Sequence, residues 1–453
     1  MTKVDVLIIG TGAAGEYAAG YVLGNGRSVG MVERAEIGGS CIFRACIPTK
    51  ALIQAASTYN RMKGADFFGL PTCREQADYR LVKQFKDGVI AGIGTGRDAR
   101  WRERGAKLFL GVARFKSPHE IIVDDDTIHA DKIIVCTGSL PSTPPIPGLA
   151  DTGFITNIEA LQLESIPERI VIIGGGAVGV EFAQIFSAFG SQVHILEMAD
   201  RILAADDADV SSAIEESMRL RNISISTSVK VNSVNKATSG KVVRLQRGDG
   251  TSQALECDEI LVAAGRKPDI EDLDLPAAGI KAGKRGIEVD ASMQTSVPHI
   301  WAAGDVTGTY LFTYVAGEQG KTAALNATTG SRTELNIALL PRATYCDPEA
   351  ASVGLTEAQA KEQGHKVKVG RFNYADLTRS IVSGDTVGFV KIVADEASGR
   401  ILGGHIVGAQ ASNLIHEVAA AMAVNATVSD VGNLLHAYPT FSEGVRYACQ
   451  AIS

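Results

Sequence analysis

Apolar residues first gather in a short run near the N-terminus, from Val4 to Gly10. A continuous apolar run of this length that ends in a turn residue is typical of a buried parallel strand. A segment of small residues follows as far as Leu23 and predicts a helix. A second apolar run at 28–32 predicts another strand, which ends at Glu33. The chain therefore opens with strand, turn, helix and strand, the order of a parallel α/β unit.

The turn between the first predicted strand and helix contains Gly10, Gly12 and Gly15 in the pattern GxGxxG. In this structural context the pattern is typical of a dinucleotide-binding unit. Gly10 permits the tight turn, Gly12 lets the backbone approach a pyrophosphate, and Gly15 lets the helix pack against the strand. The helix N-terminus offers amide donors to phosphate groups, and Glu33 can accept from a ribose hydroxyl pair.

The same pattern returns later in the chain. An apolar strand leads into Gly174, Gly176 and Gly179, and a second strand at 192–196 ends at Glu197. The first glycine and the acid are 23 residues apart in both units, since 33 − 10 and 197 − 174 give the same value. Two complete units with equal spacing favour two dinucleotide sites over two ordinary glycine turns.

Three further apolar runs end in glycine and lie near the ends of the two units. We expect these ends to lie around the dinucleotides, and a carboxylate that follows such a strand can bond a sugar alcohol of a cofactor. The residues at the three ends are Thr137, Gly138 and Ser139, then Gly265 and Arg266, then Gly304 and Asp305.

From about residue 336 the pattern changes to shorter strands and helices. Strands are predicted at 344–354, 370–374, 388–393 and 400–407, and helices at 412–424 and 428–434. This mixture predicts an antiparallel sheet with helices. Because this part has no glycine-rich phosphate turn, subunit contact is its natural role. The predicted fold class is α/β, with two Rossmann-like dinucleotide-binding domains plus an α+β C-terminal dimerisation domain.

Composition narrows the function classes. The 453 residues are 45% hydrophobic and 21% charged, which excludes wholesale disorder, and the net charge of −7 offers no extended basic surface for nucleic acid. Glycine accounts for 48 residues, about 11% against about 7% on average, so many backbone sites are special. The N-terminus lacks a signal-peptide pattern, and the sequence has no uncharged apolar span of 18 residues. We therefore expect a cytoplasmic protein that does not enter a membrane.

Two of the seven scattered cysteines, Cys41 and Cys46, lie five residues apart soon after the first unit. On an ideal helix this separation means a rise of about 7.5 Å, beyond the usual Cα–Cα span of a disulfide. The pair can therefore bridge only where the backbone departs from an ideal helix, and such a constrained bridge is comparatively easy to reduce. Because no second CxxC or histidine cluster completes a ligand set, we predict no metal site and favour a redox-active pair over a structural one.

With these motifs the chain resembles the flavoprotein pyridine nucleotide–disulfide oxidoreductases of the glutathione reductase type over essentially its whole length. The resemblance implies FAD on the first unit, a nicotinamide dinucleotide on the second, and a homodimer whose C-terminal domain completes the partner's active site. It divides the chain into a first part of the FAD-binding domain, an NAD-binding domain, a return to the FAD or central domain, and a dimerisation domain, at 1–150, 151–270, 271–335 and 336–453.

The resemblance also implies roles for single residues. Cys46 matches the thiol beside the flavin, whose thiolate gives a charge-transfer contact, and Cys41 matches the interchange thiol that meets substrate. Lys50 matches the lysine near flavin N5, and Glu181 matches its ion-pair partner. Four further matched residues complete the set, namely Asp305 for the FAD ribityl chain, Gly39 and Ser40 beside the cofactor, and Glu443, which orients the active-site base from the other subunit.

Glu197 favours NAD(H), because a carboxylate there accepts from the ribose 2′-hydroxyl and repels the 2′-phosphate of NADP. Arg201 is the one arginine just beyond this strand. The preferred interpretation is therefore a dihydrolipoamide dehydrogenase-type enzyme acting on a small dithiol or disulfide, or on a lipoyl-bearing protein. In its forward direction a dithiol would reduce the Cys41–Cys46 pair, and electrons would pass from Cys46 to FAD and then to NAD.

The C-terminal tail departs from that pattern, because Tyr438 stands where the lipoamide enzymes carry a histidine base. A phenol with a pKa of about 10 cannot serve as a base at neutral pH in the way that an imidazole of about 6.5 can. Either His436, two residues earlier, reaches in, or the chemistry does not need that proton transfer. The alternatives are a mercuric reductase-like or other NADH-dependent disulfide or metal-ion reductase, and a non-catalytic flavoprotein subunit of a larger complex. Two features argue against a mercuric reductase. Phe154 replaces the tyrosine that those enzymes carry ahead of the second glycine turn, and Cys449 is the one thiol near the C-terminus, where they carry a cysteine pair.

Overall fold

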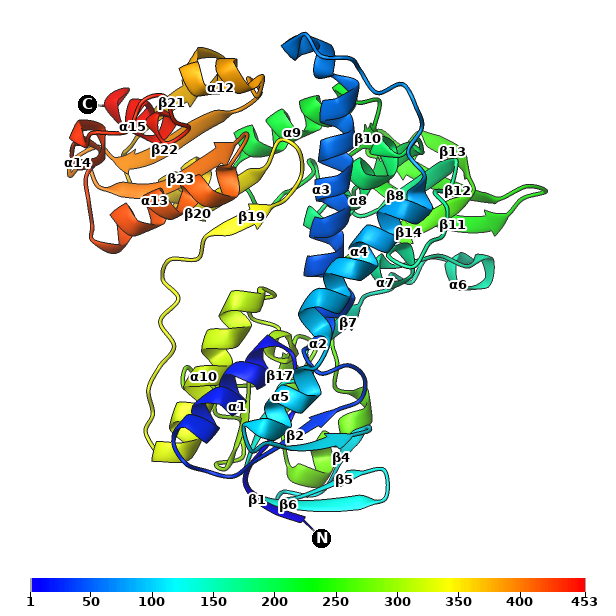
Figure 1. The fold of residues 1–453 in the computed structure, drawn as a ribbon, viewed down its shortest axis with the longest axis vertical. Coiled ribbons are helices and arrows are strands. Elements are labelled where there is room, and N and C mark those ends of the chain that lie inside the picture. Colours follow the sequence, from blue (N-terminus) through cyan, green and yellow to red (C-terminus); the bar gives the residue numbers. More distant parts are fainter. Residues whose placement is uncertain (1, 453) are drawn as a thin grey trace. The chain divides into compact units, whose positions relative to one another are not determined.

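The computed structural model describes residues 2–452. The chain divides into two compact units (Figure 1). Unit 1 contains the chain up to Pro48, Gln84–Ser142 and Gly265–Ile337. Unit 2 contains Thr49–Lys83, Thr143–Ala264 and the chain from Ala338 onward. The boundaries drawn from the sequence at 150, 270 and 335 stay a prediction.

The centre of unit 1 is a sheet with the strand order β3-β2-β1-β6-β5-β4, in which β18 also pairs with β6. The strands β1, β2, β3, β6 and β18 run parallel, whereas β4 and β5 form an antiparallel edge. The side chains from Val6 to Ile9 are buried, as the apolar run predicts. The strand bounds are β1 Thr2–Ile9, β2 Val29–Glu33, β3 Lys107–Leu110, β4 Ala113–Ser117, β5 Glu120–Val123, β6 Asp126–Val135 and β18 Ile300–Ala302.

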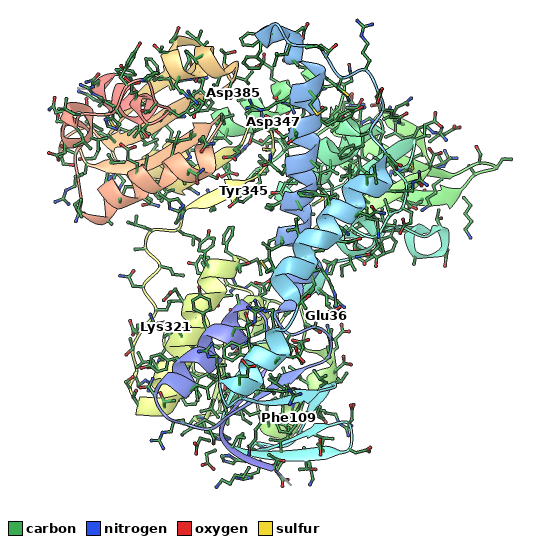
Figure 2. The ribbon with its side chains drawn as sticks, in the orientation of Figure 1. Glu36, Phe109, Lys321, Tyr345, Asp347 and Asp385 are labelled. Carbon is green, nitrogen blue, oxygen red and sulfur yellow. The ribbon has the colours of Figure 1, made fainter. Side chains whose placement is uncertain are left out.

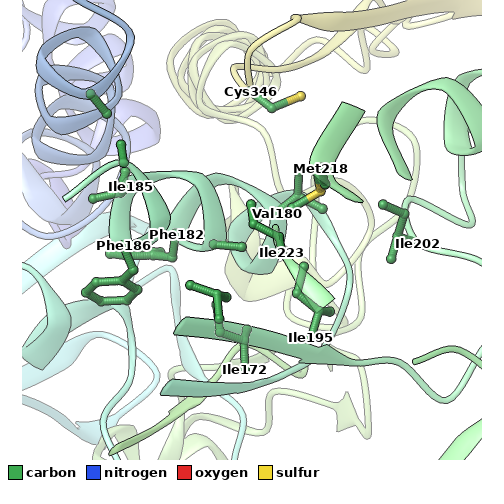
Figure 3. Close-up of a cluster of buried hydrophobic side chains, with 14 of the residues drawn as sticks. Ile172, Val180, Phe182, Ile185, Phe186, Ile195, Ile202, Met218, Ile223 and Cys346 are labelled. Atoms are coloured by element: carbon green, nitrogen blue, oxygen red, sulfur yellow. The ribbon is translucent and has the colours of Figure 1, made fainter. Parts of the chain in front are cut away.

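Unit 2 contains a second parallel sheet, with the order β10-β9-β8-β14. Figure 3 shows its core, where Val180, Phe182 and Phe186 of α8 lie among Ile172 of β8 and Ile195 of β9. The bounds are β8 Arg169–Ile173, α8 Ala177–Ala188, β9 Gln192–Leu196, α9 Ala208–Leu220, β10 Ser224–Ser226 and β14 Glu259–Val262, with an antiparallel meander of β11 Val229–Lys236, β12 Lys241–Arg247 and β13 Ser252–Cys257.

The C-terminal part of unit 2 is the predicted antiparallel sheet with helices, in the order β19-β20-β23-β22-β21. One expectation is wrong: the segment 344–354 is not a single strand. It is divided between two antiparallel strands joined by a turn that contains Pro348, which has no N–H to donate to a ladder. The bounds are β19 Arg342–Thr344, β20 Ala350–Gly354, β21 Val367–Asn373, β22 Phe389–Asp395, β23 Ile401–Val407, α13 Ala411–Ala423, α14 Val428–Asn433 and α15 Glu443–Gln450.

The remaining elements connect these sheets or cover them. They are α1 Ala13–Gly24, α2 Gly39–Phe43, α3 Cys46–Lys63, α4 Tyr79–Gly94, α5 Arg97–Glu103, α6 Leu149–Thr152, α7 Asn157–Ala160, α10 Thr313–Thr329, α11 Glu357–Glu362, α12 Thr378–Ser383, β7 Ser139–Pro141, β15 Arg266–Pro268, β16 Ala282–Gly283 and β17 Gly286–Ile287, with short 3-10 turns between some of them. Within residues 2–452, every helix is too short or too polar to cross a bilayer.

Candidate active site

The first glycine turn joins β1 to α1 and has the geometry that its sequence predicts. Gly10 has φ of +101°, and a Cβ at this position would lie 2.3 Å from the carbonyl oxygen of Cys136. A Cβ on Gly15 would lie 2.0 Å from the carbonyl oxygen of Gly10. At Gly12, by contrast, a Cβ would meet no described atom within 4 Å. Two glycines are therefore needed for packing, and the third leaves the open side through which a phosphate can approach.

The second turn, between β8 and α8, repeats this arrangement. Gly174 has φ of +115°, and its Cβ would lie 2.4 Å from the carbonyl oxygen of Ala263. A Cβ on Gly179 would lie 1.9 Å from the carbonyl oxygen of Gly174. The position of Gly176 is open, again with no described atom within 4 Å of an added Cβ. The repeat in the sequence is thus a repeat in space, one copy in each unit.

The two acidic residues at the strand ends also correspond. Glu33 Oε2 accepts a hydrogen bond from Thr11 N at 3.0 Å, and Oε1 accepts one from Ala35 N at 3.0 Å. Glu197 Oε2 accepts from Gly175 N at 2.6 Å, and Oε1 accepts from Ala199 N at 2.7 Å. Each carboxylate is held against its glycine turn by backbone donors. A carboxylate oxygen can accept further bonds, so ribose hydroxyls remain possible donors.

The strand ends of unit 1 form one polar cluster. Ser139 Oγ donates to Asp305 Oδ2 at 2.5 Å and accepts from Arg266 Nε at 2.7 Å. Beside it, among residues 2–452, the buried hydroxyl of Thr137 has no hydrogen-bond partner. The open side of Gly12 and this orphaned donor near the same turn both fit a bound FAD. Gly138, Gly265 and Gly304, each with positive φ, form the bends between these residues, as their place after the strands predicts.

The cysteine pair lies at a break between two helices, as its spacing requires. Cys41 belongs to α2, which ends at Phe43, and Cys46 begins α3. The segment before Cys41 packs on the first glycine turn, because a Cβ on Gly39 would lie 2.5 Å from the Cα of Gly12. Gly39 and Ser40 are the first two residues of α2, so the predicted cofactor contacts and Cys41 share one short helix.

Both sulfurs of the pair lie beside Thr313, the first residue of α10. Its hydroxyl is 3.3 Å from Cys41 Sγ and 3.5 Å from Cys46 Sγ. A hydroxyl at this position can donate to either thiolate. The sequence pattern gave no signal for this role, because Thr313 is 272 residues from Cys41 in the chain.

In unit 2, Lys50 and Glu181 form the predicted ion pair. Lys50 Nζ is 2.9 Å from both carboxylate oxygens of Glu181, whose side chain is only 6% exposed. Tyr345 completes the group, since its ring centroid is 4.7 Å from Lys50 Nζ and its N–H donates to Glu181 Oε1 at 3.1 Å. Figure 2 labels Tyr345 and Asp347 in the turn after β19. Lys50 is one helical turn beyond Cys46 in α3, so its ammonium has a fixed place relative to the backbone of that helix.

In the C-terminal tail, Tyr438 is exposed and the side chain of His436 is buried. The Nε2 of His436 is 2.7 Å from Glu417 Oε1, and its Nδ1 is 3.0 Å from the carbonyl oxygen of Leu434. The side chain of His436 is 6% exposed, whereas Tyr438 is 71% exposed. Both ring nitrogens of His436 are therefore already engaged within the same chain.

Glu443, which is matched to a base-orienting acid, is buried and has other partners. Its Oε2 accepts from Thr440 N and its Oε1 accepts from the Tyr447 hydroxyl, both at 3.0 Å. The hydrogen bond to Glu443 raises the pKa of Tyr447. The carboxylate thus orders the tail backbone between Thr440 and α15.

Four of the other thiols are buried, and burial disfavours the thiolate form that redox chemistry needs. Burial raises the pKa of Cys257 to about 11 and that of Cys449 to about 12, and it raises the pKa of Cys136 and Cys346 as well. Within residues 2–452, the structure contains no group of three or more His, Cys, Asp and Glu side chains placed to hold a metal ion.

Comparisons with known proteins bear on this geometry. Residues 4–320 match the family model for pyridine nucleotide-disulphide oxidoreductases, and residues 340–449 match the model of its dimerisation domain. The dihydrolipoyl dehydrogenase of Thermus scotoductus is 38% identical over 456 residues, which covers 100% of this chain and 98% of that protein. The mercuric reductase of Staphylococcus aureus is 33% identical over 449 residues, 98% of this chain and 81% of that protein.

A solved structure, the HOCl-induced flavoprotein disulfide reductase RclA from Escherichia coli, has a TM-score of 0.89 at 28% identity and covers 99% of this chain and 100% of its own. These matches confirm the resemblance, the fold class, and the FAD and nicotinamide cofactors that the resemblance implies, and the dimerisation domain supports a homodimer. The chain therefore belongs to the pyridine nucleotide-disulphide oxidoreductase family, whose members use FAD and a nicotinamide dinucleotide.

Proposed function

We propose that this chain is an NADH-linked disulfide reductase, in which the Cys41–Cys46 pair passes electrons out to an oxidised acceptor. The observation that carries this proposal is the arrangement of the tail. Tyr438, which the resemblance aligns with the histidine base of the lipoamide enzymes, is exposed, and both ring nitrogens of His436 are engaged by Glu417 and a backbone carbonyl. FAD, when bound, supplies the relay for the two electrons of the NADH hydride.

The phenol of Tyr438 is better suited to the reduction of a disulfide than to the oxidation of a dithiol. Oxidation of a dithiol needs a base to take the thiol proton, and a phenol near its ordinary pKa of about 10 is a poor base at neutral pH. Reduction needs the reverse, a proton for the departing thiolate. In a homodimer completed by the partner's tail, the Cys41 thiolate attacks the acceptor disulfide and the S–S bond breaks. The first thiol leaves with a proton from Tyr438, which regains a proton from solvent. The Cys46 thiolate then attacks Cys41 Sγ and forms the Cys41–Cys46 disulfide, so the second thiolate leaves and takes a proton from solvent.

The test compares the two directions on the purified holoenzyme. We expect NADH oxidation with lipoamide or another small disulfide to exceed NAD reduction with dihydrolipoamide. Tyr438→Phe, which lacks the proton, should slow the reduction, and Tyr438→His should raise dihydrolipoamide oxidation. Fast dihydrolipoamide oxidation that Tyr438→Phe leaves unchanged would overturn the proposal in favour of the dihydrolipoamide dehydrogenase interpretation. No turnover in either direction, with FAD bound, would favour the non-catalytic subunit.

A metal-ion acceptor is the second candidate. The tyrosine at 438 and the Phe312-Thr-Tyr314 segment are similar to mercuric reductases, and one structural neighbour is a Cu(II) complex of RclA. Against delivery of mercury by the C-terminus, Cys449 is buried, and burial raises its thiol pKa to about 12. Assays of NADH oxidation with Hg²⁺ or Cu²⁺ in place of the disulfide decide between the acceptors.

The preference for NAD over NADP belongs to the same proposal. Glu197 is fixed at the second turn by Gly175 N and Ala199 N, and its negative charge disfavours a 2′-phosphate. Arg201, the arginine just beyond this strand in the sequence, donates to the carbonyl oxygen of Ala204 at 2.9 Å and lies 3.4 Å from Asp200 Oδ1. The measurement is kcat/KM for NADH and NADPH with the same acceptor, and equal values would refute the preference.

A further inference from the structure

The carboxylate of Glu16 lies at the first glycine turn, where the proposed FAD site would hold two negative phosphate charges. Glu16 is in the first turn of α1, and its N–H donates to the carbonyl oxygen of Gly12 at 2.9 Å. The N-terminus of a helix is where a phosphate group binds. A carboxylate at the same place would repel the two negative charges of an FAD diphosphate unless another residue offset it.

Two residues of α5 meet this carboxylate. Arg97 Nη2 forms an ion pair with Glu16 Oε2, and Trp101 Nε1 donates to Glu16 Oε1 at 2.9 Å. The side chains of Arg97 and Glu16 are only 20% and 14% exposed. Both oxygens of the carboxylate are therefore held, and the positive charge is fixed beside the turn.

The guanidinium of Arg97 also has an unused donor. Its Nε is buried, and the part of the chain that the structure describes contains no hydrogen-bond partner for it. The same Nε packs against the glycine loop, since a Cβ on Gly38 would lie 2.8 Å from it. The next residue, Gly39, is the one that packs on Gly12. A buried charged donor beside a phosphate-binding turn points to an anionic acceptor that comes with the cofactor.

We propose that Arg97 is an FAD-binding residue that donates from its Nε to the diphosphate and offsets the charge of Glu16. The proposal rests on the first glycine turn being the FAD site. If the Arg97–Glu16 pair were purely structural, loss of either residue would weaken FAD binding alike; the proposal predicts different effects for the two. Loss of the arginine should weaken FAD binding, whereas loss of the carboxylate should not.

The experiment is a fluorescence titration of FAD into the apoprotein. We expect Arg97→Gln to raise the Kd about 10- to 100-fold, the range for a lost charge-assisted hydrogen bond, and to reduce the dependence of the Kd on salt. Glu16→Gln should bind FAD as tightly as the wild type or more tightly. Arg100→Gln is the matched control, because Arg100 lies on the same helix and donates to the carbonyl oxygens of Gly96 and Thr95; its Kd should not change.

An Arg97→Gln protein with the wild-type Kd would overturn the proposal, and so would equal weakening by Arg97→Gln and Glu16→Gln. If circular dichroism shows that the Arg97→Gln apoprotein does not fold, Arg97→Lys carries the test. It keeps the charge and loses the Nε donor, so a wild-type Kd would again refute the idea. Gly12→Val tests the underlying site, and normal FAD binding by that variant would show that the first turn is not the FAD site.

Discussion

A buried lysine of the C-terminal sheet pairs with acidic residues at the starts of α9 and α11 within unit 2, and its removal should lower the free energy of unfolding. Lys391 Nζ on β22 lies 2.9 Å from Asp207 Oδ1, 2.8 Å from Asp209 Oδ2 and 3.0 Å from Glu357 Oε2. The side chains of Lys391 and Asp207 are each 4% exposed. Lys391→Met removes the charge and keeps most of the apolar stem.

The loss of folding free energy in Lys391→Met depends on which partners of Lys391 are buried. Breaking a buried pair leaves an uncompensated charge, here Asp207, and costs about 3–5 kcal/mol. The pairs with Asp209 and Glu357 add less than about 1 kcal/mol each, because those side chains are 43% and 32% exposed. At roughly 2–4 °C per kcal/mol for a domain of this size, the Tm should fall by about 6–20 °C.

The assay is thermal unfolding followed by circular dichroism. Lys361→Met is the matched control, because Lys361 pairs with the same Glu357 across one turn of α11 and is 58% exposed. That pair should contribute no more than about 0.5 kcal/mol. A Tm for Lys391→Met within about 2 °C of the control would refute the reasoning. Lys391→Met with Asp207→Asn should recover part of the loss, because no buried charge then remains.

The effect also has a predicted pH dependence. Burial alone would raise the pKa of Asp207, but the hydrogen bonds from Lys391 and from the Glu357 N–H, together with the charges of His405 and Lys391, outweigh burial and lower the pKa below its ordinary value. Hydrogen bonds from Lys361 and Lys391 lower the pKa of Glu357. Carboxyls with lowered pKa stabilise the fold above their unfolded pKa of about 4 and lose that contribution as the pH falls. The Tm difference between the wild type and Lys391→Met should therefore narrow below about pH 4.

Three other perturbations give distinct signals. Cys46→Ser should abolish the long-wavelength charge-transfer absorbance on two-electron reduction, whereas Cys41→Ser should show that absorbance before reduction; the assignment is wrong if neither changes the spectrum. If Lys50 lies near flavin N5, as the resemblance implies, Tyr345→Leu should make the flavin reduction potential more negative, because the Lys50 ammonium then loses its contact with the ring. Tyr345→Phe should be close to the wild type, and equal potentials for all three proteins would exclude a role for the ring. Burial lowers the pKa of His405, so the unfolded chain binds an extra proton below about pH 6.5. The wild-type Tm should therefore fall from pH 7 to pH 5.5 more steeply than that of His405→Gln, and parallel curves would contradict this.

Local patterns predicted the turns well, because each turn is determined by residues next to one another. The spacing of Gly10, Gly12 and Gly15 specified which position is open and which two are packed, and the structure has that arrangement in both units. The five-residue spacing of Cys41 and Cys46 likewise required a break between helices. By contrast, the prediction of a single strand at 344–354 is wrong. It gave more weight to the apolar pattern than to the turn signal of Pro348 within the segment.

The contacts missed by the sequence analysis come from distant segments. Thr313 reaches Cys41 from 272 residues away, and Tyr345 reaches Glu181 from 164 residues away. Neither residue type nor spacing reveals such a meeting, since it depends on how whole elements pack. The same limit applied to His436, whose sequence position left its role open, whereas the structure shows the acid on α13 that engages it.

The repeated glycine turns differ in what covers them, and this difference bears on which dinucleotide each turn would hold. At the first turn, the Gly38–Gly39 loop packs on Gly12 and brings the cysteine helix with it, and Gly12 is half-buried. At the second turn, residues 176–178 are exposed. An enclosed turn favours a dinucleotide that stays bound, and an exposed one favours a dinucleotide that exchanges in each cycle. The proposed assignment of FAD to the first turn and of the nicotinamide dinucleotide to the second agrees with this difference, which the loop that carries Cys41 produces.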